Sequence, residues 1–263
     1  MQQSSDRELD STLAGLETGL RVNHIACFEM ITCDAETIGR EIMVDAAFSD
    51  FDHIPVKSSG NIVGVVDRQE LIPERYVLDI MHPLNGSMVV SAEEPLANFI
   101  HLLQREKYRL VVRSADIQGI VTRSDLHKLP VRLYVFTRIT HFELLMGRVL
   151  RKLSEGDENC IFRLLPAEES RKLKKELKNL GERKLNLLPV DGTSFYQKYL
   201  ALAKHFGFGD EFTSELHDIK ELRNDVAHGA RYADNDAALE NFFHRLEWIE
   251  RWAADLKRRA EPV

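Results

Sequence analysis

The spacing of hydrophobic positions changes about halfway along the chain. Up to Leu129, short apolar runs alternate with turn residues, which is typical of strands joined by tight turns. After Pro130, apolar residues recur every three or four positions over long stretches, as they do in amphipathic helices. The pattern predicts an α+β protein with strands in its first half and only helices in its second.

The first half contains an internal repeat. Shifted by 55 residues, positions 53–71 align without a gap on positions 108–126, and Gly64 to Leu71 falls on Gly119 to Leu126. Such a period indicates two copies of one unit that bury a shared face. Each copy is predicted to run strand, helix, strand, turn, strand, helix. In the second copy we expect these elements at 87–90, 95–104, 108–112, 117–122 and from Ser124 onward.

Proline marks the end of the repeat region, because Pro130 stops the preceding helix and suits the first turn of the next. We expect residues 1–20 as an N-terminal helical or flexible segment, 21–76 as the first copy, 77–129 as the second copy and 130–263 as a helical bundle. The helices predicted in this bundle span 131–153, 167–184, 194–206, 212–230 and 234–259.

The candidate chemistry lies near the end of the helix predicted at 212–230, at Arg223, Asn224 and His228, with Gly229 as the C-cap. Arginine offers a planar fork of donors to phosphate oxygens, and histidine moves a proton near neutral pH. The negative end of the helix dipole favours imidazolium at His228, which suits phosphate binding or proton donation as well as general-base catalysis. The alternative is that both side chains only complement the helix dipole and its free carbonyls.

Arg223, Asn224 and His228, spaced as Arg-Asn-x-x-x-His, resemble the signature of HEPN domains. These are small helical bundles, and many of them are metal-independent ribonucleases. The resemblance implies a homodimer in which two copies of the motif form one cleft, with RNA cleaved by 2′-hydroxyl attack and no catalytic cofactor. Members that bind nucleotides or partners without cutting RNA also exist, so a non-catalytic bundle remains the alternative.

The segment 119–125 resembles the nucleotide-contacting end of a CBS domain, with the pattern Gly-h-x-Thr-x-x-Asp, where h is apolar. With the repeat, the resemblance covers roughly Arg21 to Leu129 as a tandem pair. It implies that Asp125 binds ribose hydroxyls and that Thr122 contacts the ribose or phosphate of AMP, ADP or ATP. The candidate nucleotide-binding residues are Gly119, Thr122, Arg123 and Asp125. The alternative for this segment is a plain helix N-cap.

The first copy departs from that pattern, because Asp67 and Glu70 stand where the family has threonine and aspartate. A carboxylate at the phosphate-facing position would repel the ligand unless a cation bridged them. We therefore expect one nucleotide site, chiefly in the second copy, and a structural first copy.

The two halves of the chain differ in net charge. Residues 1–129 carry 12 Lys and Arg against 20 Asp and Glu, a net −8, whereas residues 130–263 carry 23 against 22, a net +1. The first half is therefore a poor surface for nucleic acid. In the second half, one basic segment is the candidate RNA-binding surface, with a solvated helix face as the alternative. Its residues are Arg171, Lys172, Lys174, Lys175 and Lys178.

The composition indicates where in the cell the protein is expected and what its cysteines can do. No apolar run has the length of a membrane span, and the N-terminus lacks a signal-peptide pattern, so we expect a cytoplasmic protein without membrane association. The three cysteines, Cys27, Cys33 and Cys160, lack metal-ligand spacing, so free thiols and no metal site are expected. The leading hypothesis is an adenine-nucleotide-regulated endoribonuclease, with a toxin or a defence or stress effector as its candidate roles. The alternative is a nucleotide-sensing adaptor whose bundle dimerises or docks a partner.

Overall fold

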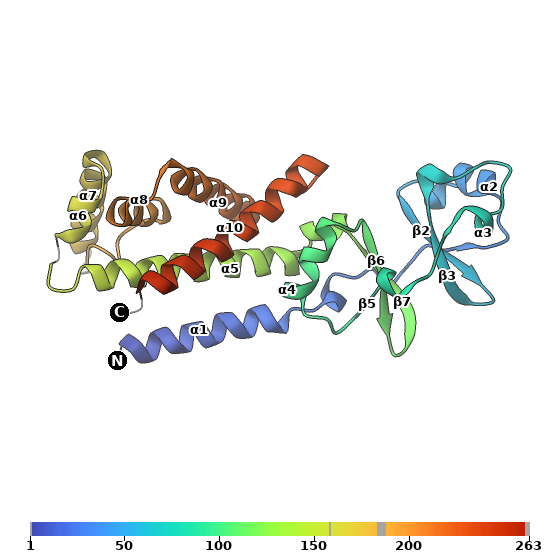
Figure 1. Cartoon of the computed structure of the whole chain (residues 1–263), viewed down its shortest axis with the longest axis horizontal. Helices are drawn as coiled ribbons and strands as arrows, with labels where there is room; N and C mark the ends of the chain where they lie inside the picture. Colours follow the sequence, from blue (N-terminus) through green and yellow to red (C-terminus); the bar gives the residue numbers. More distant parts are fainter. Residues whose placement is uncertain (1, 158, 183–187, 261–263) are drawn as a thin grey trace. The chain divides into compact units, whose positions relative to one another are not determined.

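The computed structural model describes residues 2–157, 159–182 and 188–260 (Figure 1). The chain divides into two compact units. One comprises Thr18–Val131, and the other comprises Arg132–Val263 together with the N-terminal residues up to Glu17. The segment we expected at 1–20 is mostly a helix, α1 (Gln2–Gly19).

The first repeat copy forms a four-stranded sheet in the order β1-β2-β3-β4. Strand β1 (Cys33–Asp34) runs parallel to β2 (His53–Ser58), and β3 (Asn61–Asp67) and β4 (His82–Pro83) continue the sheet antiparallel. Helix α2 (Gly39–Val44) joins β1 to β2, and α3 (Val77–Ile80) precedes β4. Between β3 and α3 the chain makes one 3-10 turn, η3 (Arg68–Glu70).

The second copy repeats this arrangement in a three-stranded sheet in the order β5-β6-β7. Strand β5 (Val89–Ser91) is parallel to β6 (Tyr108–Arg113), which pairs antiparallel with β7 (Asp116–Thr122). The helix predicted at 95–104 is α4 (Leu96–Phe99) continued by the 3-10 helix η5 (Ile100–Gln104). The helix predicted from Ser124 is also 3-10, η6 (Arg123–His127).

The strand registers confirm the repeat. His53 faces Asp67 in the first copy, and Tyr108 faces Thr122 in the second, 55 residues later in both strands. The register shifts at Val56/Lys57 and at Val111/Val112, again 55 residues apart. Because a bulge fixes which side chains face each side of a sheet, the two copies present equivalent positions on equivalent faces.

The two copies bury a shared face, as the repeat predicted. One hydrophobic cluster joins β3 of the first copy to β6 and β7 of the second, and its buried members are Ile62, Val65, Met88, Leu110 and Ile120. A separate cluster fills the first copy's own interior beneath α2 and α3. Strand β3 therefore contributes buried residues to both clusters, Val65 to the shared one and Val66 to the interior of the first copy.

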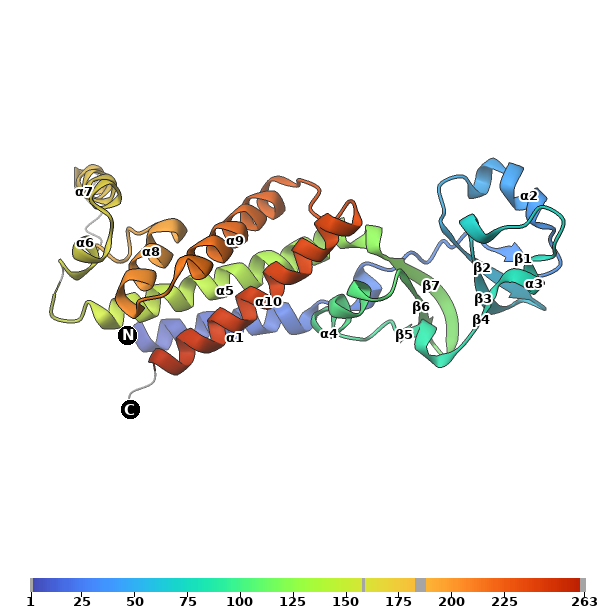
Figure 2. The ribbon, with the colours of Figure 1, turned by 45° about the horizontal axis from the view of Figure 1, so that its top comes forward.

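The helical unit contains most of α1 and of α5 (Leu129–Leu153), together with α6, α7, α8, α9 and α10 (Figure 2). These last five span Cys160–Leu164, Ala167–Glu182, Phe195–Phe206, Asp210–His228 and Asp236–Ala260. The predicted helices agree within two residues at each end, except that positions 183 and 184 lie outside the described residues. Helix α6 was not predicted, because it has only five residues.

Buried aromatic residues hold the helical unit together. Phe242 and Phe243 of α10 are fully buried, and the rings of Phe212 and Trp252 meet at 4.5 Å between α9 and α10. Helix α1 joins this unit through Glu17, whose carboxylate accepts from Arg138 of α5 at 3.3 Å. Among the described residues, none of the helices combines the length and apolar character needed to cross a bilayer.

Candidate functional site

Helix α9 ends as the sequence predicted. Gly229 adopts the left-handed conformation with φ of 75°, and its N–H donates to the carbonyl of Asp225. This termination places Arg223, Asn224 and His228 on the last turn and a half of the helix. Arg223 and Asn224 are half-buried, and His228 is exposed.

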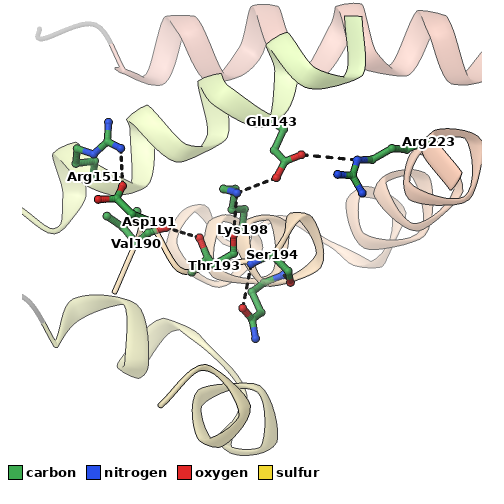
Figure 3. Close-up of polar contacts among 9 residues, drawn as sticks. Glu143, Arg151, Val190, Asp191, Thr193, Ser194, Lys198 and Arg223 are labelled. Carbon is green, nitrogen blue, oxygen red and sulfur yellow. Dashed lines mark hydrogen bonds and ion pairs between the residues drawn. The ribbon is translucent and has the colours of Figure 1, made fainter. Parts of the chain in front are cut away.

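Arg223 has a partner on α5. Its Nε lies 3.9 Å from Oε2 of Glu143, and 39% of its side chain is exposed (Figure 3). Charge-assisted hydrogen bonds are about 2.7–2.9 Å long, so this ion pair is loose. The guanidinium can therefore reach a phosphate without breaking a strong bond.

Glu143 is held more firmly on its other side. Its Oε1 accepts from Nζ of Lys198 at 2.8 Å, and the same ammonium donates to the carbonyl of Thr193 at 2.8 Å. The carboxylate thus lies between a tightly bound lysine of α8 and a loosely bound arginine of α9, as Figure 3 shows.

A further cation reaches the end of α9 from α5. Nη2 of Arg132 donates to the carbonyl of Val226 at 2.8 Å, and its Nε donates to the same oxygen at 3.2 Å. This carbonyl is one of the acceptors that a helix leaves free at its C-terminus. Sequence reasoning missed Arg132, since no motif links it to residues 94 positions away.

A cavity of about 360 Å³ lies beside Glu143 in the same unit. Three cationic residues line it, Arg148, Arg151 and Lys198, against two acidic ones, Glu143 and Asp191. The guanidinium of Arg151 donates to Asp191 at 2.5 Å (Figure 3). Its lining carries more positive than negative groups, and Arg223 adds another cation at its Glu143 side.

The candidate RNA-binding residues all lie on α7 and are exposed. Lys172 differs from the other four, because it pairs with Glu169 at 2.8 Å and with Glu168 at 2.9 Å. Hydrogen bonds to Glu169 and Glu168 raise the pKa of Lys172. The remaining four are spaced i, i+3, i+4 and i+7, which places them on one helix face. These are Arg171, Lys174, Lys175 and Lys178.

In the second repeat copy, Thr122 and Asp125 form a capping box at the start of η6. Oδ2 of Asp125 accepts from the backbone N–H of Thr122 at 2.6 Å, and its Oδ1 pairs with Lys128 at 2.7 Å. The side chain of Asp125 is only 11% exposed. The N-cap arrangement is therefore present, and a ribose would have to share these carboxylate oxygens.

The other two candidate nucleotide-binding residues have structural partners. The guanidinium of Arg123 donates to the carbonyls of Leu103 and Gln104, each at 3.0 Å. A Cβ at Gly119 would lie 3.0 Å from the carbonyl oxygen of Cys27, so the close backbone approach favours glycine there. Neither observation assigns a ligand role to these positions.

In the first copy, Asp67 and Glu70 replace the threonine and aspartate of the CBS pattern, and each has a histidine partner. Nδ1 of His53 lies 2.6 Å from Oδ1 of Asp67, and Nε2 of His82 lies 2.8 Å from Oε2 of Glu70. The carboxylates that replace the expected threonine and aspartate are thus drawn into a cluster with imidazoles, which the sequence did not predict.

Comparison with known proteins identifies the first unit. The family model of the CBS domain matches residues 77–132, which confirms the CBS fold of the second copy. Together with the repeat, this makes the strand-containing unit a tandem CBS pair, followed by an all-helical region. The family match ends at residue 132, within the first turn of α5. No curated protein matches the chain.

Several solved structures are similar to part of the chain. The CBS domain of a bacterial CNNM/CorC family Mg²⁺ transporter is 20% identical, with a TM-score of 0.38 over 49% of this chain and 82% of that one. The same domain in complex with ATP scores 0.38 at 20% identity, over 50% and 97%. An uncharacterized conserved protein from Pyrococcus horikoshii scores 0.37 at 20% identity, over 41% and 90%.

Proposed function

We propose that this chain is a metal-independent endoribonuclease whose activity responds to an adenine nucleotide bound by its CBS pair. The observation that carries the catalytic part is the end of α9, where the guanidinium of Arg223 and the imidazole of His228 are both accessible. Arg223 would bind the phosphate oxygens as charge builds on them, and His228 would transfer the proton. No protein metal ligand is needed for either step.

The surroundings of these residues suit an RNA chain. The cavity beside Glu143 and the basic face of α7 offer cations to neighbouring phosphates, and this type of contact dominates nucleic-acid affinity. Two copies of the motif in a homodimer would supply one cleft with two arginines and two histidines.

Regulation would depend on Thr122 and Asp125. A carboxylate accepts hydrogen bonds from vicinal ribose hydroxyls, and a nucleotide would replace the internal bond between Thr122 and Asp125. Helix α5 begins at Leu129, two residues after η6 ends at His127. A structural change at η6 would therefore be transmitted along only a few residues of chain to the helical unit. The nucleotide would regulate activity by binding one conformation of the protein more tightly than the other.

Purified protein incubated with total cellular RNA in EDTA, with and without AMP or ATP, tests the proposal. Fragments ending in 2′,3′-cyclic phosphate, with yields that change when nucleotide is added, are the expected result. Intact RNA under all these conditions would remove the catalytic claim, whereas cleavage indifferent to nucleotide would remove only the regulatory one.

The alternative function is a nucleotide-sensing adaptor, and the contact between Glu143 and Arg223 favours it. If Arg223 serves only to join α9 to α5, the bundle needs no substrate. The adaptor predicts nucleotide binding without RNA cleavage, and an Arg223→Ala variant that still docks its partner.

A further inference from the structure

We propose that Asp67, Glu70 and His82 in the first CBS copy bind one divalent transition-metal ion, with Zn²⁺ or a similar ion as the ligand class. One ligand atom from each side chain lies within 4.8 Å of the others. The site is separate from the ribonuclease proposal and does not depend on it.

The sheet brings these side chains together from three elements. Asp67 ends β3, Glu70 lies in η3, and His82 begins β4. His82 pairs with Val65, and Asp67 lies two residues beyond Val65 on the same strand. Because side chains two apart on a strand share a face, His82 and Asp67 project from one side of the sheet. The 3-10 turn then places Glu70 beside them.

The distances suit an ion with small adjustments. A tetrahedral ion about 2.0–2.1 Å from each ligand holds its ligand atoms roughly 3.3 Å apart. Oε2 of Glu70 and Nε2 of His82 lie 2.8 Å apart, and the three ligand atoms all lie within 4.8 Å of one another. Glu70 and His82 are 51% and 50% exposed, so both side chains have room to move and the ion can enter. A site with three protein ligands leaves a fourth position for water or an exogenous ligand.

A second histidine orients the best-buried ligand. His53 faces Asp67 across β2 and β3, and its Nδ1 lies 2.6 Å from Oδ1 of Asp67. The Asp67 side chain is 17% exposed and that of His53 13%. Histidine–carboxylate pairs of this kind hold ligands in place at metal sites. Asp67 is thus fixed before an ion arrives, and only the two exposed ligands need to adjust.

The chemistry of the donors limits the choice of ion. One imidazole nitrogen with two carboxylates suits Zn²⁺, Mn²⁺, Fe²⁺ or Co²⁺, whereas Mg²⁺ and Ca²⁺ prefer oxygen ligands alone. The second copy lacks this donor set, because Thr122 and Asp125 occupy the positions of Asp67 and Glu70. Cys27 takes the place of His82, since it pairs with Ile120 as His82 pairs with Val65. The two copies would thus take different ligands at equivalent positions, with a cation in the first.

Spacing along the chain could not reveal this site, because its third ligand follows the first two only after α3. The usable signal was the pair of acidic replacements at Asp67 and Glu70. A carboxylate that would repel a phosphate is suited to bind a cation.

Titration of the full chain with Co²⁺ tests the proposal, after removal of any affinity tag and of bound metal with EDTA followed by gel filtration. Visible absorption reports Co²⁺ coordination, and Zn²⁺ should displace the probe while millimolar Mg²⁺ should not. We expect one ion per chain and at least tenfold weaker binding for His82→Ala and for Glu70→Gln. His53→Ala should weaken binding about tenfold, as loss of an orienting partner does.

Matched controls separate this site from casual surface binding. His217→Ala removes an exposed histidine of α9, and Glu74→Gln removes an exposed acid of the first copy, so both should bind Co²⁺ like the parent. The variants must unfold at the parent's temperature in EDTA, and Zn²⁺ should raise that temperature for the parent but not for Glu70→Gln. If His82→Ala unfolds at a lower temperature than the parent, His82→Gln is used in its place. Absence of saturable binding, or binding unaffected by the Glu70 and His82 substitutions, would overturn the proposal.

Discussion

His53 and Tyr108 occupy equivalent positions of the two CBS copies, and their rings meet with centroids 4.7 Å apart. Each begins an interior strand of its sheet, β2 or β6, and each faces a candidate ligand-binding residue in its own copy, Asp67 or Thr122. The contact therefore connects the cation-binding candidate in the first copy with the nucleotide-binding candidate in the second.

The shared face beneath this contact contributes to the stability of the CBS pair. Leu110 of β6 is fully buried in the cluster between the copies, whereas Leu78 of α3 is 53% exposed. Leu110→Ala should lower the free energy of unfolding by about 2–5 kcal/mol through lost burial and the cavity it leaves. Leu78→Ala should change it by less than about 0.5 kcal/mol. Urea denaturation of both variants measures the difference, and equal midpoints would contradict this view of the interface.

The two hairpin turns form a natural pair for a backbone test. Gly60 and Ala115 occupy equivalent positions with φ of 84° and 71°. The left-handed conformation costs alanine roughly 1–2 kcal/mol in the folded state. Glycine is more flexible in the unfolded chain, and fixing it on folding costs about 0.4–1 kcal/mol more than fixing alanine. Ala115→Gly should therefore stabilise the protein by about 0.5–1 kcal/mol, and Gly60→Ala should destabilise it by a similar amount. Shifts of the same sign for the two variants would refute this reading.

The proposed nucleotide site can be tested with a substitution at Asp125, and Asp116 provides the control. Asp125→Asn keeps the size of the side chain but removes the charge that accepts ribose hydroxyls, so AMP or ATP should bind at least tenfold more weakly by calorimetry. Loss of the capping box also lowers stability by about 1 kcal/mol. Asp116→Asn, at the exposed start of β7, should leave both quantities unchanged. Nucleotide affinity unaltered in Asp125→Asn would place the ligand elsewhere.

Glu143 is expected to limit the affinity for RNA, because it competes with phosphate for Arg223. Glu143→Gln removes that competition, and a partly exposed ion pair is worth up to about 1 kcal/mol, so RNA should bind up to about fivefold more tightly. The gain should disappear in the double variant Glu143→Gln with Arg223→Ala. If the gain persists there, Glu143 acts through Lys198 and the cavity instead.

Local patterns predicted the fold well, because strand and helix periods, turn residues and caps are encoded within a few positions. Gly229, Gly207 and Ser194 were sufficient to locate the ends of α9 and α8. The 55-residue repeat predicted the shared face between copies, since equivalent sequences bury equivalent faces.

The surroundings of each candidate site could not be predicted in this way. Arg132 and Glu143 reach α9 from α5, and His82 reaches Asp67 through strand pairing. Such contacts depend on how elements pack, and no spacing along the chain encodes them. The sequence thus proposed Arg223, His228, Thr122 and Asp125, while their partners came only from the structure.

The most direct test of the ribonuclease proposal is the single-turnover rate of RNA cleavage in EDTA by Arg223→Ala and His228→Ala. The matched control is His217→Ala, which removes an exposed histidine from the same helix. We predict that each motif variant loses at least a hundredfold in rate while its unfolding temperature stays unchanged, because loss of one acid–base or charge-stabilising group costs about 10²–10⁴-fold. The control should cleave like the parent. Cleavage at the parent's rate by both motif variants would contradict the account.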